Sequence, residues 1–285
     1  MASSVDGVSA PATGRLFVVS TPIGNMGDFS YRAVETLRAA RLVLAEDTRH
    51  SRHLLDRYDI ATPLAPYHEH NEAKATPGLV ARLAAGEDMA LITDAGTPLV
   101  SDPGARLVRA AIDAGVEIVP IPGASALLAA LVASGLDAER FTFFGFLPRK
   151  GKERAGALAQ LATLPHTALL YEAPTRLVGT LEELETLGVG DRRAVVAREM
   201  TKQYEEVQRG TLSALRAYYI GAPPRGEIVI VIAGAPPVAP TDDMIRDRAR
   251  ALRARGLSTR DVTAALVDEL GVSRNVAYKA AQEDG

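Results

Sequence analysis

The residues with the clearest chemical character lie in one loop, within the segment LITDAGTPLVSDPGARL at residues 91–107. This loop contains Asp94, Asp102, two glycines and two prolines, and no basic residue precedes Arg106. A simple chain reversal needs about four residues, so the surplus indicates a loop of defined shape. Carboxylates accept hydrogen bonds, and glycine lets the backbone approach a ligand closely. We therefore expect this loop to hold a ligand.

Four other predicted strands run into loops of similar composition. In an open parallel sheet, ligands bind beyond the carboxyl ends of the strands, so five such loops on one edge predict a pocket. None has the Gly-Lys-Ser/Thr ending of a phosphate-binding loop, and none has the GxGxxG spacing of a dinucleotide site. A nucleoside triphosphate or NAD is therefore disfavoured. The four loops are STPIGN (20–25), PGAS (122–125), YEAPTR (171–176) and AGAPP (233–237).

Short apolar stretches alternate with longer amphipathic ones from Leu16 onward, which predicts strand–helix units around a largely parallel sheet and an α/β fold. Ser30 followed by YRAVETLRAA predicts a capped helix, and residues 103–115 predict another that starts at Pro103. The expected strands are residues 16–20, 41–46, 88–94, 116–122, 141–147, 167–172, 194–199 and 227–234.

Two proline-rich connectors, PIPGAS (120–125) and GAPPVAP (234–240), divide the chain. We expect a disordered leader at 1–14, an N-terminal α/β domain at 15–122, a second α/β domain at 123–235 and a helical domain at 241–285.

The last of these regions has the pattern of a helix-turn-helix. Ser258 with Asp261 resembles a capping box, Gly271 marks a turn, and Ser273 can cap a further helix. Residues 246–260 hold six arginines and one aspartate, so a basic first helix able to contact a phosphate backbone is expected.

Composition limits the function classes. The chain has 285 residues, 47% of them hydrophobic, with a net charge of −3, so any polyanion must be bound by a local basic surface. The absence of cysteine excludes disulfides and thiolate chemistry. The amino-terminal residues lack a secretion pattern, and no apolar run reaches the roughly 20 residues of a membrane span. A cytoplasmic protein without a membrane partner is expected.

Seven segments of the chain carry a family resemblance: VVSTPIGNMGDFSYRAVETL, AEDTRHSRHLL, DAGTPLVSDPG, PIPGASALLAAL, FFGFLPRKGKER, LLYEAPTRL and GEIVIVIAG. They occur in the order seen in the ribosomal RNA small subunit methyltransferase I family, a branch of the tetrapyrrole methylase superfamily. The chain resembles that family from about Leu16 to its C-terminus. One departure from the wider superfamily is visible: Gly96-Thr97-Pro98 stands where those enzymes usually carry Gly-Asp-Pro.

The resemblance implies S-adenosylmethionine as methyl donor and the 2'-hydroxyl of a cytidine in the decoding region of 16S ribosomal RNA as acceptor. It also implies two α/β domains of tetrapyrrole methylase type with the donor in the cleft between them, and a homodimer. A cationic sulfonium donor suits a carboxylate-rich loop. Asp102 directly precedes Pro103 and is expected to cap a helix instead. The expected donor-binding residues are Pro22, Ile23, Asp94, Gly96, Thr97, Val100, Ser101, Ala124, Ser125, Tyr171 and Ala233.

Methyl transfer to a ribose hydroxyl needs alignment and a group that takes or stabilises the hydroxyl proton. No motif identifies that group. The candidates are Glu199, Lys202 and Glu172, with Glu46 and Asp47 in AEDTRH as further possibilities. Each can instead form a surface ion pair or contact RNA.

Local basic clusters are the expected RNA contacts: Arg49 and Arg52 on one predicted helix, and Arg149, Lys150, Lys152 and Arg154 in a loop expected to be mobile. His50 and His53 lack a third ligand nearby, so no metal site is expected. The RNA partner is either small-subunit ribosomal RNA or the assembled small subunit.

The alternatives to this function are a small-molecule (porphyrinoid) methylase of the same superfamily and a nucleic-acid-binding regulator without enzymatic activity. Thr97 and the basic clusters disfavour the former; the five loops disfavour the latter.

Overall fold

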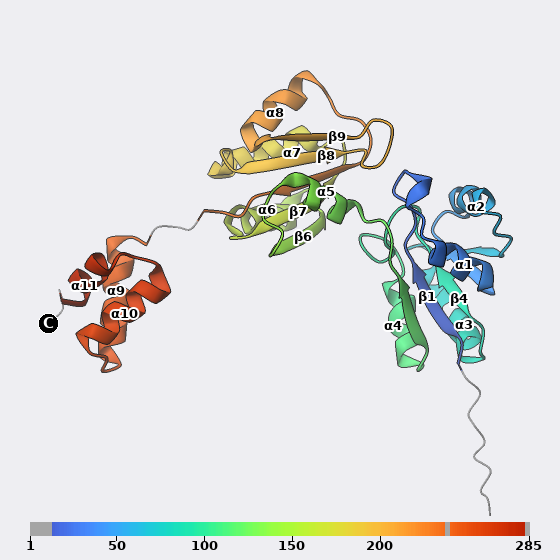
Figure 1. Cartoon of the computed structure of the whole chain (residues 1–285), viewed down its shortest axis with the longest axis horizontal. Helices are drawn as coiled ribbons and strands as arrows, with labels where there is room; N and C mark the ends of the chain where they lie inside the picture. The colour runs from blue at the N-terminus through green and yellow to red at the C-terminus, as the bar shows by residue number, and fades with distance from the viewer. Residues whose placement is uncertain (1–12, 237–239, 283–285) are drawn as a thin grey trace, which may run out of the picture. The chain divides into compact units, whose positions relative to one another are not determined.

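The computed structural model describes residues 13–236 and 240–282, and the chain divides into two compact units after Ala235. The larger unit contains two five-stranded sheets with helices on both faces of each, and the smaller unit is helical (Figure 1). The expected fold class, two α/β regions followed by a helical region, is confirmed.

The first sheet is entirely parallel, with strand order β3-β2-β4-β1-β5. Its central strands are buried because helices cover both faces, as parallel sheets require. The short strand β3 was not expected from the sequence. The bounds are β1 (Arg15–Val19), β2 (Leu42–Ala45), β3 (Leu64–Pro66), β4 (Met89–Leu91) and β5 (Glu117–Ile121).

Helices α1 (Tyr31–Ala39) and α2 (Thr48–Arg57) pack on one face of this sheet, and α3 (Glu72–Ala84) and α4 (Ala105–Asp113) pack on the other. Ser30 caps α1 as expected, because its side chain accepts a hydrogen bond from the Ala33 amide. The chain from β1 leaves toward one face and the chain from β4 toward the other, so a crevice opens between the carboxyl ends of these two neighbouring strands.

The second sheet is mixed, with order β6-β7-β10-β8-β9, and only its β6–β7 pair is parallel. The expectation of a largely parallel sheet is therefore wrong for this half. Strand β9 is half-buried and polar, EVQRGT, and was not expected. The bounds are β6 (Phe141–Phe146), β7 (Thr167–Glu172), β8 (Arg193–Arg198), β9 (Glu206–Thr211) and β10 (Ile228–Ile232).

Helix α5 (Ala126–Ser134) covers one face of this sheet. The other face carries α6 (Gly151–Thr163), α7 (Leu177–Leu184) and α8 (Leu212–Gly221), whose leucines form the largest apolar cluster of the unit. The short helices η1 (Met26–Asp28) and η2 (Glu185–Val189) complete the connections.

The antiparallel direction of β10 corrects the expected position of one loop. Ile228 pairs with Glu172 and Ile232 pairs with Ala168, so the carboxyl end of β10 lies at the opposite edge of the sheet from the carboxyl end of β7. The AGAPP loop therefore does not share an edge with YEAPTR. Pattern and spacing did not reveal this, because an apolar strand reads alike in either direction.

The helical unit contains α9 (Asp242–Ala254), α10 (Thr259–Leu270) and α11 (Arg274–Gln282) around a small apolar core. Ser258 caps α10 by accepting a hydrogen bond from the Asp261 amide, and Gly271 ends the helix in a left-handed conformation. Several of the expected phosphate-binding arginines instead have partners within this unit: Arg248 pairs with Glu269, and Arg253 donates to the Ala281 carbonyl.

The expected leader, residues 1–14, lies mostly outside the described residues. Gly14 is within them, and its amide donates a 2.8 Å hydrogen bond to the Leu83 carbonyl. The first described residues therefore already contact the first sheet's unit before β1 begins.

Replacing the α10 cap tests the structure of the helical unit. We expect Ser258→Ala to weaken α10 by about 1 kcal/mol, which corresponds to roughly fivefold faster amide hydrogen exchange in its first turn. Ser258→Asn retains the acceptor and should leave exchange near the wild-type rate. Equal acceleration in both variants would mean that the cap hydrogen bond does not stabilise the helix.

Candidate active site

A cavity of about 410 Å³ lies in the larger unit, between loops of the first sheet and the ends of β7, β8 and β10. Most of the residues expected to bind a methyl donor line it. These are Ile23, Asp94, Gly96, Thr97, Val100, Ser101, Ser125 and Tyr171. Phe146, Met200 and Glu227, which pattern alone did not identify, line the same cavity.

Backbone pairing joins the loops after β1 and β4 at the crevice. The Thr21 amide donates to the Gly96 carbonyl (2.8 Å), and the Gly96 amide donates to the Thr21 carbonyl (3.1 Å). Gly96 has φ +88°, and a Cβ there would lie 3.3 Å from Ile23 Cγ2. Glycine is favoured at this position because other L residues rarely adopt that conformation.

The Thr97 hydroxyl ties a third loop to these two. It donates to the Ala124 carbonyl (3.2 Å) and lies 3.0 Å from the Ser20 hydroxyl. Ala124 therefore supports the cavity wall, although it is not among the residues that line the cavity. The departure from the Gly-Asp-Pro pattern thus places a hydroxyl, rather than a carboxylate, at the junction of the loops.

The loop after β4 adopts unusual backbone conformations. Leu99 and Ser101 have φ of +72° and +68°, which costs energy in residues other than glycine. Helix α4 begins at Ala105 with Gly104 as its cap, so Asp102 does not cap it. The expectation of a capping role for Asp102 was wrong because the helix starts two residues later than Pro103 indicated.

Asp102 instead lines the cavity and has an unusual protonation equilibrium. Burial raises the pKa of Asp102 to about 6, and the nearby charges of Glu46 and Asp94 contribute further, while a hydrogen bond from Thr93 opposes the rise. Burial likewise raises the pKa of Glu46. The negative charges of Glu46 and Asp94 therefore disfavour ionisation of Asp102. An acid that titrates near neutral pH is suited to accept a proton.

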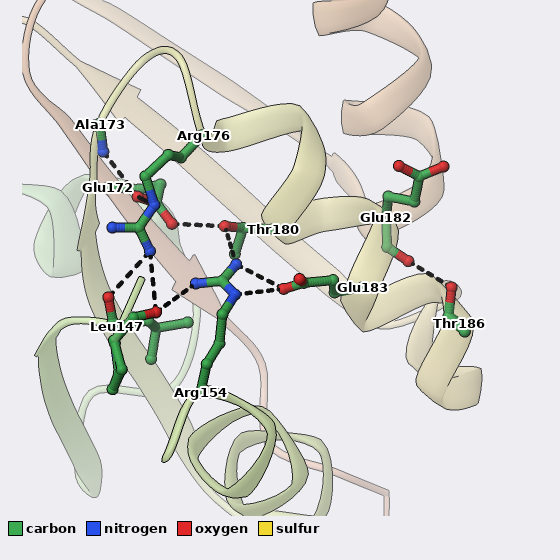
Figure 2. A network of polar contacts seen from close by, with 10 residues as sticks. Leu147, Arg154, Glu172, Ala173, Arg176, Thr180, Glu182, Glu183 and Thr186 are labelled. Carbon is green, nitrogen blue, oxygen red and sulfur yellow. Dashed lines mark hydrogen bonds and ion pairs between the residues drawn. The ribbon is translucent and has the colours of Figure 1, made fainter. Parts of the chain in front are cut away.

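Glu172, an expected catalytic residue, is fully engaged in a buried polar network (Figure 2). Its carboxylate accepts from the Thr180 hydroxyl (2.6 Å) and the Ala173 amide (2.9 Å), and lies 3.3 Å from Arg176 Nε. The side chain is 0% exposed. The expectation of a base is not supported, because both oxygens already hold donors.

Arg154, expected to contact RNA from a mobile loop, belongs to the same network. It lies in α6, is buried, and its guanidinium contacts Thr180 (2.9 Å), Glu183 (2.6 Å) and the Pro148 carbonyl (3.1 Å). This expectation was wrong: a cation with these partners stabilises the fold and does not face a phosphate (Figure 2). Charge alone does not distinguish it from its exposed neighbours in sequence.

Glu199 and Lys202 pair with one another beside the cavity. Lys202 Nζ lies 2.9 Å from Glu199 and 3.1 Å from Glu227, a cavity residue. Burial alone would raise the pKa of Glu199, but hydrogen bonds from the Glu227 amide and from Lys202 outweigh it and lower the pKa. Hydrogen bonds to the carboxylates of Glu199 and Glu227 outweigh the effect of burial on Lys202 and raise its pKa. Both side chains are therefore held in their charged forms and are poor proton acceptors.

The loop that carries this pair also contacts the first sheet's loops. Thr201 accepts a hydrogen bond from the Asn25 amide (3.1 Å), and a Cβ on Gly24 would lie 2.3 Å from Lys202 Cγ. Glu199 and Thr201 both have positive φ, at +52° and +68°. We infer that this pair fixes the cavity rim rather than performing the chemistry.

The remaining expected residues fall in separate places. Asp47 caps α2, and its hydrogen bond with Arg49 lowers its pKa, so it is a weak base. Ala233 lies beyond Ile232, at the end of β10 away from the cavity, where its carbonyl accepts from Arg192. Pro22 is buried next to Ile23 but does not line the cavity.

The expected RNA-binding cations other than Arg154 lie at the surface. Arg149, Lys150 and Lys152 are exposed around the start of α6. Arg49 and Arg52 lie on α2 and have acidic neighbours on the same helix, Asp47 and Asp56.

Among the described residues, the charged side chains that line the cavity are all acidic. Asp94, Asp102 and Glu227 are acidic lining residues, whereas no lysine, arginine or histidine is among the lining residues. Glu172 also lines the cavity, but its carboxylate is buried against Arg176. Such a wall favours a cationic ligand and disfavours a phosphate.

The described residues contain no cluster of three or more potential metal ligands from His, Cys, Asp or Glu. None of the described helices has the length and apolar character needed to cross a membrane.

Residues 15–216 match the family model of Tetrapyrrole (Corrin/Porphyrin) Methylases. Solved structures share this fold at low sequence identity. Diphthine synthase aligns with a TM-score of 0.61 and 17% identity over 78% of this chain and 90% of its own. Uroporphyrin-III C-methyltransferase from Thermus thermophilus, complexed with S-adenyl homocysteine, gives a TM-score of 0.55 and 20% identity over 77% of this chain and 97% of its own. The chain is thus a tetrapyrrole-methylase-type protein.

Relatives of higher sequence identity show to which family among the tetrapyrrole methylases the chain belongs. The chain is 46% identical to ribosomal RNA small subunit methyltransferase I of Synechocystis over 95% of its length and 98% of the relative, and 44% identical to that of Pseudomonas aeruginosa over 95% and 97%. The chain belongs to the ribosomal RNA small subunit methyltransferase I family. The expected family and the expected enzyme class, a methyltransferase, are confirmed.

Removing the Thr180 hydroxyl tests the buried network, because this hydroxyl donates a hydrogen bond to Glu172 and accepts one from Arg154 (Figure 2). We expect Thr180→Val to lower the free energy of unfolding by about 2 kcal/mol, since two buried charged groups each lose a partner. Chemical denaturation measures this change. Thr186→Val removes an exposed hydroxyl from the next turns of the chain and should cost less than about 0.5 kcal/mol. Equal costs in the two variants would contradict the network's role.

Proposed function

We propose that this protein transfers a methyl group from S-adenosylmethionine to the 2'-hydroxyl of a cytidine in the decoding region of 16S ribosomal RNA. The observation that carries the proposal is a carboxylate-lined cavity in a chain that is 46% identical to a ribosomal RNA small subunit methyltransferase I over nearly its whole length. The relatives' name supplies the ribosomal RNA, and the family resemblance supplies the cytidine and its position.

The residues of the cavity fit the methyl donor of this family, S-adenosylmethionine. When bound, it supplies a methyl group on a positively charged sulfonium. Asp94 and its neighbouring carboxylates favour that charge, Val100 and Tyr171 offer apolar surface, and Gly96 allows close backbone approach. No cation on the described wall opposes it.

Asp102 is the residue we assign to proton transfer. Its carboxylate lines the cavity, and its raised pKa makes it a better proton acceptor than an ordinary aspartate. In the proposed reaction the 2'-hydroxyl loses its proton to Asp102, the ribose oxygen forms a bond to the methyl carbon, and the carbon–sulfur bond breaks. The products are a 2'-O-methylated ribose, S-adenosylhomocysteine and a proton, which Asp102 then releases to solvent.

RNA is held by the exposed cations Arg49, Arg149, Lys150 and Lys152 and by the half-buried Arg52, which lie outside the acidic cavity. The acceptor is the assembled small subunit or its RNA, in the cytoplasm. A homodimer also belongs to this proposal, and the molar mass in solution by light scattering would test it.

Direct methyl transfer tests the reaction. Small ribosomal subunits from cells lacking this enzyme should accept label from S-adenosylmethionine, and nucleoside mass spectrometry should identify 2'-O-methylcytidine. Subunits from cells that contain the enzyme provide the control, because their site is already modified. Donor binding without any label in ribosomal RNA would overturn the RNA proposal and favour a small-molecule acceptor.

The pH dependence of methyl transfer tests Asp102. Because the base must be ionised, we expect kcat/KM to fall about tenfold per pH unit below pH 6 and to level off above it. Asp102→Asn should lower the rate by about 100-fold and abolish the inflection. Glu46→Gln removes a neighbouring negative charge and should move the inflection to lower pH. An unchanged profile in Asp102→Asn would exclude this residue as the base.

A further inference from the structure

The end of strand β6 places an exposed aromatic ring at the cavity. Phe146 lines the cavity and remains 55% exposed, so it lies at the opening. Its ring centroid is 5.5 Å from that of Tyr171, which in turn contacts Phe143 at 4.8 Å. The outer face of Phe146 has no partner ring among the described residues.

A β-bulge in β6 determines the side of the sheet on which the Phe146 ring lies. Along β6 and β7, Phe143 pairs with Leu169 and Phe146 pairs with Tyr171, so three steps on β6 match two on β7. The extra residue lies by Gly145, whose φ is +62°. In a regular strand Phe146 would face the opposite side from Phe143. The bulge turns it to the side of Tyr171 and the cavity, and bulges of this kind re-aim side chains next to active sites.

The backbone that follows the ring is clamped. Arg176 Nη2 donates to the carbonyls of Leu147 (3.0 Å) and Pro148 (3.4 Å), and Arg154 Nη1 donates to the Pro148 carbonyl (3.1 Å). Both arginines belong to the network held by buried Glu172 (Figure 2). The network thus restrains the backbone directly after the ring, which reduces the entropy lost when a ligand stacks on it.

The charged residues that follow the ring in sequence indicate its ligand. Arg149, Lys150 and Lys152 follow Phe146 within six residues and are exposed, whereas the cavity wall itself is acidic. An aromatic face beside cations matches a base with its neighbouring phosphates. The cationic methyl donor lacks phosphates and is favoured by the acidic wall instead.

We propose that Phe146 is the stacking platform for the acceptor nucleobase, which is splayed out of the RNA so that its ribose enters the cavity. This inference rests on the proposed function. Phe146 is then a specificity-determining residue that positions the nucleoside, and the arginine network is its support. Stacking is tolerant of base identity, so the platform selects an unstacked nucleotide rather than a particular base.

Steady-state kinetics with small ribosomal subunits from cells lacking this enzyme test the platform. We expect Phe146→Ala to lower kcat/KM for subunits by about tenfold or more, chiefly through KM, and Phe146→Trp to restore most of it. The dissociation constant of S-adenosylhomocysteine, measured by calorimetry, should change less than twofold. Phe141→Ala is the matched control, because Phe141 is a 40% exposed ring at the other end of the same strand and away from the cavity. It should leave both quantities unchanged.

Two results would overturn the inference while the proposed function stands. Wild-type kinetics in Phe146→Ala would show that the ring contacts no substrate. Parallel losses of S-adenosylhomocysteine affinity and of methyl transfer would assign the ring to the donor's adenine. If instead the wild-type enzyme labels no ribosomal RNA, the proposed function itself fails and the inference fails with it.

Discussion

The reciprocal backbone pairing of Thr21 with Gly96 is the interaction on which the rest of the cavity depends. It joins the loops after β1 and β4, the two strands from which the chain leaves toward opposite faces of the first sheet. Parallel topology opens a crevice at such a point, but the crevice becomes a defined wall only if the loops are held together. Gly96 makes the pairing possible by adopting φ +88°, and Thr97 extends it to the loop that begins α5.

The second sheet contributes a wall of different origin, organised by a buried charge. Glu172 at the end of β7 is removed from water, so it must be surrounded by donors. The hydrogen bonds of Glu172 and its partners connect α6, α7 and the turn after β6 (Figure 2). A carboxylate that looked catalytic from its neighbours in sequence thus acts through packing, by fixing the positions of groups that do face the cavity.

Much of this arrangement followed from sequence, and the failures have specific causes. The glycine and proline loops identified most of the cavity, because backbone demands such as that of Gly96 leave a residue-type signature. The direction of a strand leaves no such signature in the residue types, so the loop at Ala233 was assigned to the wrong edge of the second sheet. Arg154 and Lys152 are indistinguishable by charge, yet helical phase buries one and exposes the other. Asp102 was taken for a cap because proline after aspartate is a helix-start signal, and only the tertiary structure shows that the helix begins later.

The distribution of charge connects the two walls to one reaction. A methyl donor with a sulfonium and an RNA chain with phosphates require opposite surroundings, and a single site must bring them into contact. Here the carboxylates lie on the cavity wall, while Arg149, Lys150 and Lys152 lie outside it. The ring of Phe146 stands between these regions in sequence and is uncharged, so it can border both without favouring either ion. An acceptor nucleotide that stacks there would keep its phosphates among the cations while its ribose reaches the acidic side, where Asp102 is available to take the proton.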